Sequence, residues 1–382
     1  MSTVLDDTLL ENASVLTELD SAGLLRSAAT AGAQVRSAAQ AAREAGVDRL
    51  SGSRPRALVL LRRPGSSRYA VPLFAALLGS ACPVPVVVAD AAPTWLGPLD
   101  VLVAHTADPD DRDLADSVGR AVRRGCEVVL SSPREGPIVA AGAGAARVLE
   151  PRVPVPPGLD FPRALATLLI AGSALGLLSV DLDELAAELD RESERDHPSH
   201  ESFVNPAKSL ALRLADHTPL LWGVDAVATE LAGYASATLA GHAAMVAHSA
   251  DVAEAAAAVG LQRALANPGE GGIFHDPFDD PINPGAGSGS LAAPPRVVLL
   301  ATEDGDPEAA SIRRAGRTWD TADTLHPVEE IPLGSRNASL RRAAVLATRF
   351  DLAALYLGLA TAVLGSDRGA DPDGAWQLSG PA

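Results

Sequence analysis

The segment RALVLLRRPGSSRYAVPLFAALLGSA, residues 56–81, decides the fold class. Its first part, residues 56–61, is an apolar run typical of a buried strand, and residues 71–81 predict a helix. Between them RRPGSSRYA, residues 62–70, supplies the glycine and serines of a tight turn. Backbone N–H groups at a helix N-terminus lack partners within the helix, and the helix dipole favours an anion there. The segment therefore predicts a strand–turn–helix unit that can hold a phosphate group.

Short apolar runs continue to alternate with helical segments through the first half of the chain. Further strands are expected at residues 83–90, 100–106 and 127–132, with a helix at 113–125. Strands of nearly continuous valine and leucine that alternate with helices are typical of a parallel sheet covered on both faces. The apolar run 164–180 contains glycine and serine and falls just short of a membrane span, so we expect a buried helix there.

A second unit with the same order of elements follows a charged helix at residues 181–196. Its expected strands are 218–223, 296–302 and 326–333, its expected helices are 205–216, 225–260, 307–322 and 340–365, and a loop rich in glycine and proline is expected at 267–295. The sequence thus predicts an α/β protein with two mostly parallel sheets flanked by helices, with N-terminal helices and a C-terminal helix. The expected divisions are an N-terminal helical segment (1–52), a first domain (53–180), a charged helix and linker (181–201) and a second domain with the C-terminal helix (202–382).

Charge and cysteine content narrow the classes of partner. The formal net charge of −17 at pH 7 argues against nucleic acid and against an anionic membrane surface. Two cysteines, Cys82 and Cys126, cannot form a disulfide framework or a four-cysteine zinc site. The N-terminal residues lack the cationic and apolar regions of a secretory signal, so a cytoplasmic location is expected. An anionic ligand would have to be bound by local donors against the field of the whole protein.

Several short motifs resemble those of a known family. Five segments occur in the same order along the chain as the motifs of that family. They are the turn at residues 63–67, AHTADPDDR at 104–112, SSPREG at 131–136, the Pro-Arg pair in FPRAL at 161–165 and NPAKSLALRLA at 205–215. In order and spacing the chain resembles the double sugar-isomerase (SIS) domain proteins of the bifunctional phosphoglucose/phosphomannose isomerase family, and it looks closest to their divergent actinobacterial branch. The resemblance implies two SIS-type three-layer domains, a homodimer and no cofactor.

The resemblance also implies where a sugar phosphate would bind. The positions carried over are Gly65, Ser66, Ser67, Thr106, Ser131 and Ser132. The chain departs from the family at Ala104, which has no hydroxyl, and at Pro109, which has no N–H donor. Three carboxylates, Asp108, Asp110 and Asp111, bring negative charge to the same place. Arg62 and Arg63 could compensate for the lost hydroxyls.

The catalytic residues of the family are only partly matched. Arg163 stands in the Pro-Arg pair, where it could offset charge on an enediolate. The family's glutamate, which moves a proton between C1 and C2 of the open-chain sugar, falls at Gly241. The histidine that helps to open the ring falls at His275, and the lysine often found at the C-terminus is missing. His242 could replace the lost base, because histidine exchanges protons near neutral pH.

Simpler structural roles stand beside each of these functional ones. Gly65 and Ser67 could form only a tight turn, Thr106 and Asp108 a local turn and helix cap, and Arg163 a salt bridge at a helix start. Acidic residues around His275, and the HPSH segment at 197–200, could hold a divalent cation, although solvated loops of this kind are much commoner; no metal site is predicted.

Three functions remain open from the sequence. The first is a phosphosugar isomerase-like protein that binds a hexose 6-phosphate-type ligand at a degenerate catalytic site. The second is an active glucose 6-phosphate or mannose 6-phosphate aldose–ketose isomerase with a substitute base. The third is a regulatory or interaction module without catalysis.

Overall fold

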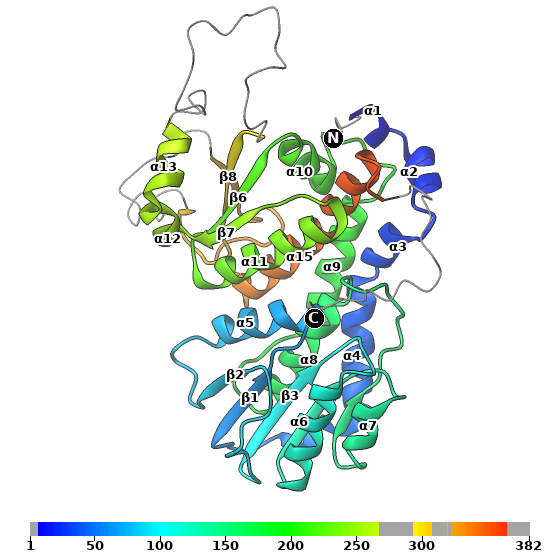
Figure 1. Ribbon diagram of the computed structural model, residues 1–382, viewed down its shortest axis with the longest axis vertical. Helices are drawn as coiled ribbons and strands as arrows, with labels where there is room; N and C mark the ends of the chain where they lie inside the picture. Colours follow the sequence, from blue (N-terminus) through cyan, green and yellow to red (C-terminus); the bar gives the residue numbers. More distant parts are fainter. Residues whose placement is uncertain (1–6, 267–292, 308–318, 320–321, 365–382) are drawn as a thin grey trace, which may run out of the picture.

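The structure, a computed structural model, describes residues 7–266, 293–307, 319 and 322–364. Figure 1 shows two parallel sheets at opposite ends of the molecule, separated by helices. This is the predicted α/β architecture, with N-terminal helices and a long C-terminal helix. The division of the chain into domains at residues 53, 181 and 202 stays a prediction.

The first sheet has the strand order β2-β1-β3-β4-β5, and all its strands are parallel. Alternate residues of β1 face opposite sides: Leu58 and Leu60 pack in one apolar core, and Val59 and Leu61 pack in another. Helices α4, α5 and α8 cover the first face, and α6 and α7 cover the second. The strands are β1 (Ala57–Leu61), β2 (Val86–Ala89), β3 (Asp100–His105), β4 (Glu127–Ser131) and β5 (Arg147–Leu149), and the helices are α4 (Ala31–Ala45), α5 (Ser67–Leu78), α6 (Arg112–Arg123), α7 (Pro137–Ala141) and α8 (Phe161–Ala174).

The second sheet, also parallel, has the order β7-β6-β8-β9. Leu221 of β6 faces the large core shared with α10, α11 and α15, whereas Trp222 faces a smaller core with α12. The strands are β6 (Thr218–Gly223), β7 (His248–Asp251), β8 (Pro295–Leu300) and β9 (Asp323–Leu325), and the helices are α10 (Pro206–Leu214), α11 (Ala226–Ala243), α12 (Val252–Ala257), α13 (Val259–Ala266) and α15 (Ala338–Ala360).

Helices at the junction bind the two halves into one core. α9 (Leu182–Arg195) packs along both α4 and α15, while α11 packs on both α5 and α15 (Figure 1). The N-terminal elements are α1 (Asp7–Leu10), α2 (Ala13–Leu19), α3 (Leu24–Ala28) and the short 3₁₀ helix η1 (Val47–Leu50). Within the described residues one helix, α15, is long and apolar enough to cross a membrane, and its apolar window is wholly buried inside the protein.

Two sequence-based expectations were wrong, and one further strand was not anticipated. The helix expected over 225–260 is interrupted, because Ala244 adopts a left-handed backbone (φ 50°) that ends α11, and β7 follows. The strand expected at 326–333 is irregular, since prolines within it remove N–H donors, and the pairing strand β9 precedes it. The three-residue edge strand β5 was too short to give a pattern. Most of the helix expected at 307–322 and most of the loop expected at 267–295 lie outside the described residues.

Candidate functional site

The carboxyl ends of β1, β3 and β4 bring the predicted binding residues to one edge of the first sheet. Strands of a parallel sheet end on the same side, and ligands of open α/β sheets bind there. After β1 the chain turns through Gly65, whose φ of 84° is a conformation that side-chain-bearing residues rarely adopt. Ser66 is the N-cap of α5, and Ser67 is its first residue. The predicted strand–turn–helix unit is therefore present.

Four side chains from different elements form a buried hydrogen-bonded chain at this edge. Ser66 Oγ donates to Asp160 Oδ1 at 2.5 Å, and His105 Nε2 lies 2.8 Å from Asp160 Oδ2. On its other side, His105 Nδ1 lies 3.0 Å from Ser131 Oγ. Because a carboxylate can only accept, the Nε2–H of His105 donates to Asp160. All four residues are at most 5% exposed.

Arg163 lies beside this chain in the first turn of α8. Its Nη2 is 3.6 Å from Asp160 Oδ2, and its Nη1 donates to the carbonyl of Val153 at 3.3 Å. The residue is 8% exposed, and its Nε is buried without a hydrogen-bond partner in the part of the chain that the structure describes. Burial lowers the pKa of Arg163, and Asp160 opposes that shift. The site thus contains a buried cation with one donor unused.

The Asp160 carboxyl is ionised in this environment. Burial by itself raises its pKa, but the hydrogen bonds from His105 and Ser66 and the positive charge of Arg163 outweigh that effect. The net result is a pKa well below the ordinary range of an aspartate. A negative charge therefore lies where the resemblance places the phosphate of a ligand.

The remaining predicted hydroxyls make local hydrogen bonds. Ser67 Oγ donates to the carbonyl of Leu61 at 3.1 Å, and Ser132 Oγ donates to that of Pro133 at 2.8 Å. Thr106 Oγ1 accepts from Asp108 N at 3.1 Å, which is the local-turn arrangement considered from the sequence. The cap of α6 is supplied by a different residue, Asp111. Each of these hydroxyls must give up an internal hydrogen bond before it can donate to an anion.

The two arginines before the turn are also paired. Arg62 Nε lies 3.0 Å from Asp90 Oδ1. Arg63 donates through Nε and Nη2 to the carboxylate of Asp111, both at 2.7 Å, and only 11% of its side chain is exposed. In this conformation the Arg63 guanidinium is fully engaged, whereas Arg62 is held only by an exposed ion pair with Asp90.

A stacked aromatic pair links the cluster to the second half of the chain. Phe161, which follows Asp160, stacks on Tyr234 of α11 with ring centroids 4.0 Å apart. Tyr234 Oη donates to Asp351 of α15 at 2.5 Å, and Thr238 Oγ1 lies 3.5 Å from the same oxygen. Burial raises the pKa of Asp351 to about 8, although these hydroxyls lower it. The two buried aspartates of the junction are therefore in opposite protonation states near neutral pH.

The predicted catalytic residues of the second half lie at the end of α11. Gly241 is exposed, and a Cβ built on it meets no atom within 4 Å. His242 is half-buried, and its Nε2 lies 3.5 Å from a Cβ built on Gly158, two residues before Asp160. Burial lowers the pKa of His242. His242 therefore lies beside Gly158, in the loop that leads to Asp160 and Arg163. His275 lies outside the described residues.

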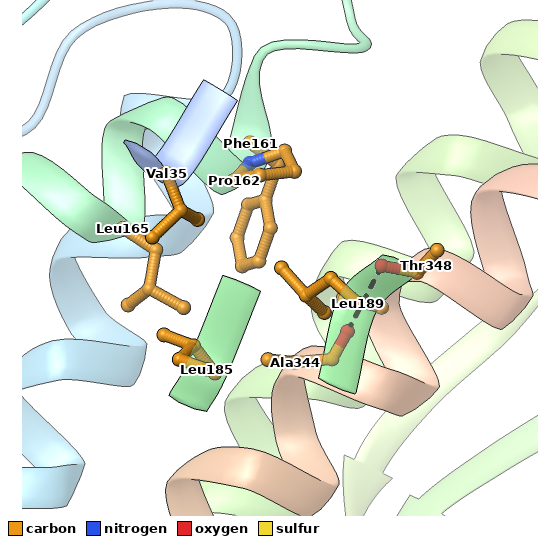
Figure 2. A pocket seen from close by; sticks show the side chains of 9 residues that line it. Val35, Phe161, Pro162, Leu165, Leu185, Leu189, Ala344 and Thr348 are labelled. Atoms are coloured by element: carbon orange, nitrogen blue, oxygen red, sulfur yellow. Dashed lines mark hydrogen bonds between the residues drawn. The ribbon is translucent and has the colours of Figure 1, made fainter. Parts of the chain in front are cut away.

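An apolar pocket lies behind the start of α8, where α4, α8, α9 and α15 meet (Figure 2). Its one hydroxyl, Thr348 Oγ1, donates to the carbonyl of Ala344. The pocket has no charged lining residue and does not suit a phosphate. Its lining residues are Val35, Phe161, Pro162, Leu165, Leu185, Leu189, Ala344, Ala347 and Thr348.

No metal-binding arrangement is present in the described part of the chain, where no three histidine, cysteine, aspartate or glutamate side chains are grouped to hold an ion. In the HPSH segment, His197 Nδ1 pairs with Ser199 Oγ and His200 Nδ1 with the carbonyl of Arg195. The acidic residues around His275 lie outside the described residues.

The sequence-based analysis missed His105 and Asp160, the two residues at the centre of the cluster. His105 is the last residue of β3, and a polar residue at the carboxyl end of a buried parallel strand is itself a signal of a site. Asp160 immediately precedes α8, and its carboxylate makes no hydrogen bond to the backbone of that helix. A helix cap is the usual interpretation of aspartate in that place, so its interaction with His105 could not be predicted.

Comparison with known proteins agrees with this architecture. The family model for the bacterial phospho-glucose isomerase C-terminal SIS domain matches residues 203–367. No match was found among curated protein sequences. Solved structures with the same arrangement cover nearly all of the chain. The chain has the double SIS fold.

Three solved structures illustrate the similarity. A hypothetical protein from Thermus thermophilus has a TM-score of 0.59 and 14% identity, over 92% of this chain and 89% of that one. Tagatose-6-phosphate ketose/aldose isomerase from Escherichia coli has a TM-score of 0.52 and 12% identity, over 91% and 95%. The C-terminal domain of glucosamine-fructose-6-phosphate aminotransferase from Francisella tularensis has a TM-score of 0.53 and 10% identity, over 89% and 96%. At 10–14% identity these structures share the fold of this chain, and the family model adds sequence similarity over residues 203–367.

Proposed function

We propose that the protein binds a hexose 6-phosphate-type ligand at the carboxyl ends of β1, β3 and β4 and does not isomerise it. The observation that carries this proposal is Arg163, a buried guanidinium whose Nε has no hydrogen-bond partner among the described residues and whose Nη2 lies 3.6 Å from Asp160, the acceptor of the Ser66 hydroxyl. A buried donor without an acceptor is costly. A phosphate oxygen is an acceptor that suits a guanidinium in both charge and geometry.

The absence of turnover is proposed from the end of α11. The isomerase route implied by the resemblance needs a carboxylate there, and glycine occupies the position at Gly241. The nearby His242 is a weaker base than an ordinary histidine, because burial lowers its pKa. An active isomerase with His242 or His275 as base is the alternative that the experiment below tests.

A non-catalytic interaction or regulatory module is the second candidate. It is favoured by the internal hydrogen bonds of the five serine and threonine hydroxyls, since each would have to exchange an internal hydrogen bond to donate to a phosphate. Such a module would respond neither to sugar phosphates nor to replacement of Arg163.

We extend the proposal to the finer features that the resemblance implies. These are membership of the bifunctional phosphoglucose/phosphomannose isomerase family in its actinobacterial branch, a homodimer, and a cytoplasmic location. Light scattering coupled to size-exclusion chromatography tests the dimer directly. A mass of one chain, 39.1 kDa, at micromolar concentration would refute it.

A phosphorus NMR time course of fructose 6-phosphate with stoichiometric protein tests the function. We expect the substrate resonance to broaden or shift without new resonances. Arg163→Gln should abolish the change, whereas Arg213→Gln, which replaces a half-buried arginine on α10, should retain it. Growth of glucose 6-phosphate or mannose 6-phosphate resonances would establish an isomerase. An unchanged spectrum would leave the interaction module.

A further inference from the structure

The Asp160 carboxylate is bound as an external anion would be. Three donors converge on its two oxygens: Ser66 Oγ at 2.5 Å, His105 Nε2 at 2.8 Å and Arg163 Nη2 at 3.6 Å. Its side chain is only 3% exposed, so water contributes little to its solvation. A neutral donor, an imidazole and a guanidinium around one carboxylate are a typical anion-binding set.

Asp160 does not cap the helix that it precedes with a side-chain hydrogen bond. It stands at the N-cap of α8, yet its side chain accepts no hydrogen bond from the first turn of that helix. Most aspartates at the helix starts that the structure describes do cap: Asp111 accepts from Leu114 N, and Asp181 accepts from Glu184 N. The carboxylate of Asp160 therefore serves the cluster alone, and a change of its side-chain rotamer would leave the backbone bonds of α8 intact.

The second half of the chain provides a contrast at the equivalent edge. Asp225, after β6, accepts from Thr302 N at 2.7 Å, Thr302 Oγ1 at 2.8 Å and Glu303 N at 3.1 Å. It also caps α11 by accepting from Ala228 N at 2.8 Å. In both halves an aspartate of the chain occupies donors at the strand ends. Of these two aspartates only Asp160 is free of a capping role, so only the first site can open by moving a side chain.

We infer that Asp160 is an internal substitute for the anionic group of the ligand, and that the ligand binds by displacing it from Ser66, His105 and Arg163. The inference rests on the proposed function for the nature of the ligand. Ligand and carboxylate cannot share these donors, because two anions at hydrogen-bond distance repel each other. Asp160 thereby sets the specificity of the site: a weakly bound anion is excluded, and a ligand with further contacts is required.

Two substitutions test the displacement. Asp160→Ala removes the carboxylate and leaves its three donors facing the vacated space. Asp160→Asn keeps the shape and removes the charge. We expect both variants to bind inorganic phosphate and fructose 6-phosphate at least about tenfold more tightly than the unchanged protein, because the competing anion is gone. Asp100→Ala is the matched control, since Asp100 is equally buried but lies at the opposite, amino end of β3.

Formate gives a readout that does not depend on the sugar. It matches the lost carboxylate in charge and size, so sodium formate should raise the melting temperature of Asp160→Ala above that of a sodium chloride control. It should leave the unchanged protein unaffected. The inference would be overturned if formate failed to stabilise Asp160→Ala and neither Asp160 variant bound phosphate more tightly. Tryptophan fluorescence, to which the buried Trp222 contributes, verifies that both variants are folded.

The two proposals fail in different ways. If the unchanged protein binds fructose 6-phosphate and the Asp160 variants bind it no more tightly, displacement is refuted and the proposed function stands. If formate stabilises Asp160→Ala but none of the proteins binds fructose 6-phosphate, the donors accept an anion and the proposed sugar-phosphate function is refuted.

Discussion

Replacing Asp351 with asparagine should change how stability depends on pH. The carboxyl is fully buried beneath α11, and its pKa is raised from 3.8 to about 8. Between these values the folded protein holds a proton that the unfolded chain releases, so stability falls as pH rises. From pH 5 to pH 8 the loss is three pKa units, or about 4 kcal/mol at ~1.4 kcal/mol per unit. Asparagine has no proton to lose, so Asp351→Asn should gain about that much relative to the unchanged protein over the same interval.

Thermal unfolding followed by tryptophan fluorescence measures this difference. An unfolding entropy of about 2.1 cal/mol/K per residue over 382 residues converts 4 kcal/mol into a relative shift of about 5 °C between the two pH values. Tyr234→Phe is the control: it removes the hydroxyl that donates to Asp351 but retains the carboxyl, so it should keep the pH-dependent loss. If the melting temperatures of Asp351→Asn and of the unchanged protein changed by the same amount between pH 5 and pH 8, the reasoning would be refuted.

Three further substitutions test a buried hydrogen-bonded lysine and the packing around the junction. Lys208 is 1% exposed, and its ammonium donates to the carbonyls of Pro198 and His200, both at 2.7 Å. Lys208→Met should therefore lower the free energy of unfolding in urea by about 2–3 kcal/mol. An unchanged urea midpoint would contradict this. Gly32→Ala would place a methyl group against the backbone of α9, so it should strongly lower the melting temperature. On α11 the methyl group of Gly233→Ala would meet no atom within 4 Å. That substitution should be neutral or stabilise the protein by about 0.5–1 kcal/mol. Equal effects of the two alanines would exclude a packing cause.

The fold could be predicted where strands are buried on both faces. The strand expected at 218–223 is β6 residue for residue, and β1 lies within the strand expected at 56–61, whereas α5 begins four residues before the helix expected at 71–81. Prediction failed where local composition is ambiguous. Alanine-rich sequence continues on both sides of β7, so nothing local indicates the left-handed residue that ends α11. Short edge strands such as β5 depend on the neighbouring strand for their hydrogen bonds.

The candidate site could be predicted in position but not in its internal bonds. The strand ends placed Ser66 and Ser131 at one edge, as expected. The carboxylate that pairs with them comes from Asp160, 94 residues along the chain from Ser66 and 55 from His105. No periodicity connects residues at such separations. A hydroxyl identified from sequence as a ligand-binding group can therefore be engaged by the chain itself, and only the fold reveals it.

Net charge and local donors act on different stages of binding. The charge of −17 repels an approaching dianion, but this field is screened within about 8 Å at physiological ionic strength, so it slows encounter more than it weakens the bound state. Once the ligand is in the site, the nearest charges decide its affinity, and these are Asp160 and Arg163 at 3.6 Å from each other. Binding then amounts to an exchange of one anion for another on the same donors. A ligand with only a phosphate gains little in that exchange, whereas a sugar phosphate can add hydroxyl contacts that the carboxylate does not make. The site therefore favours a phosphorylated polyol over phosphate alone for as long as Asp160 is present.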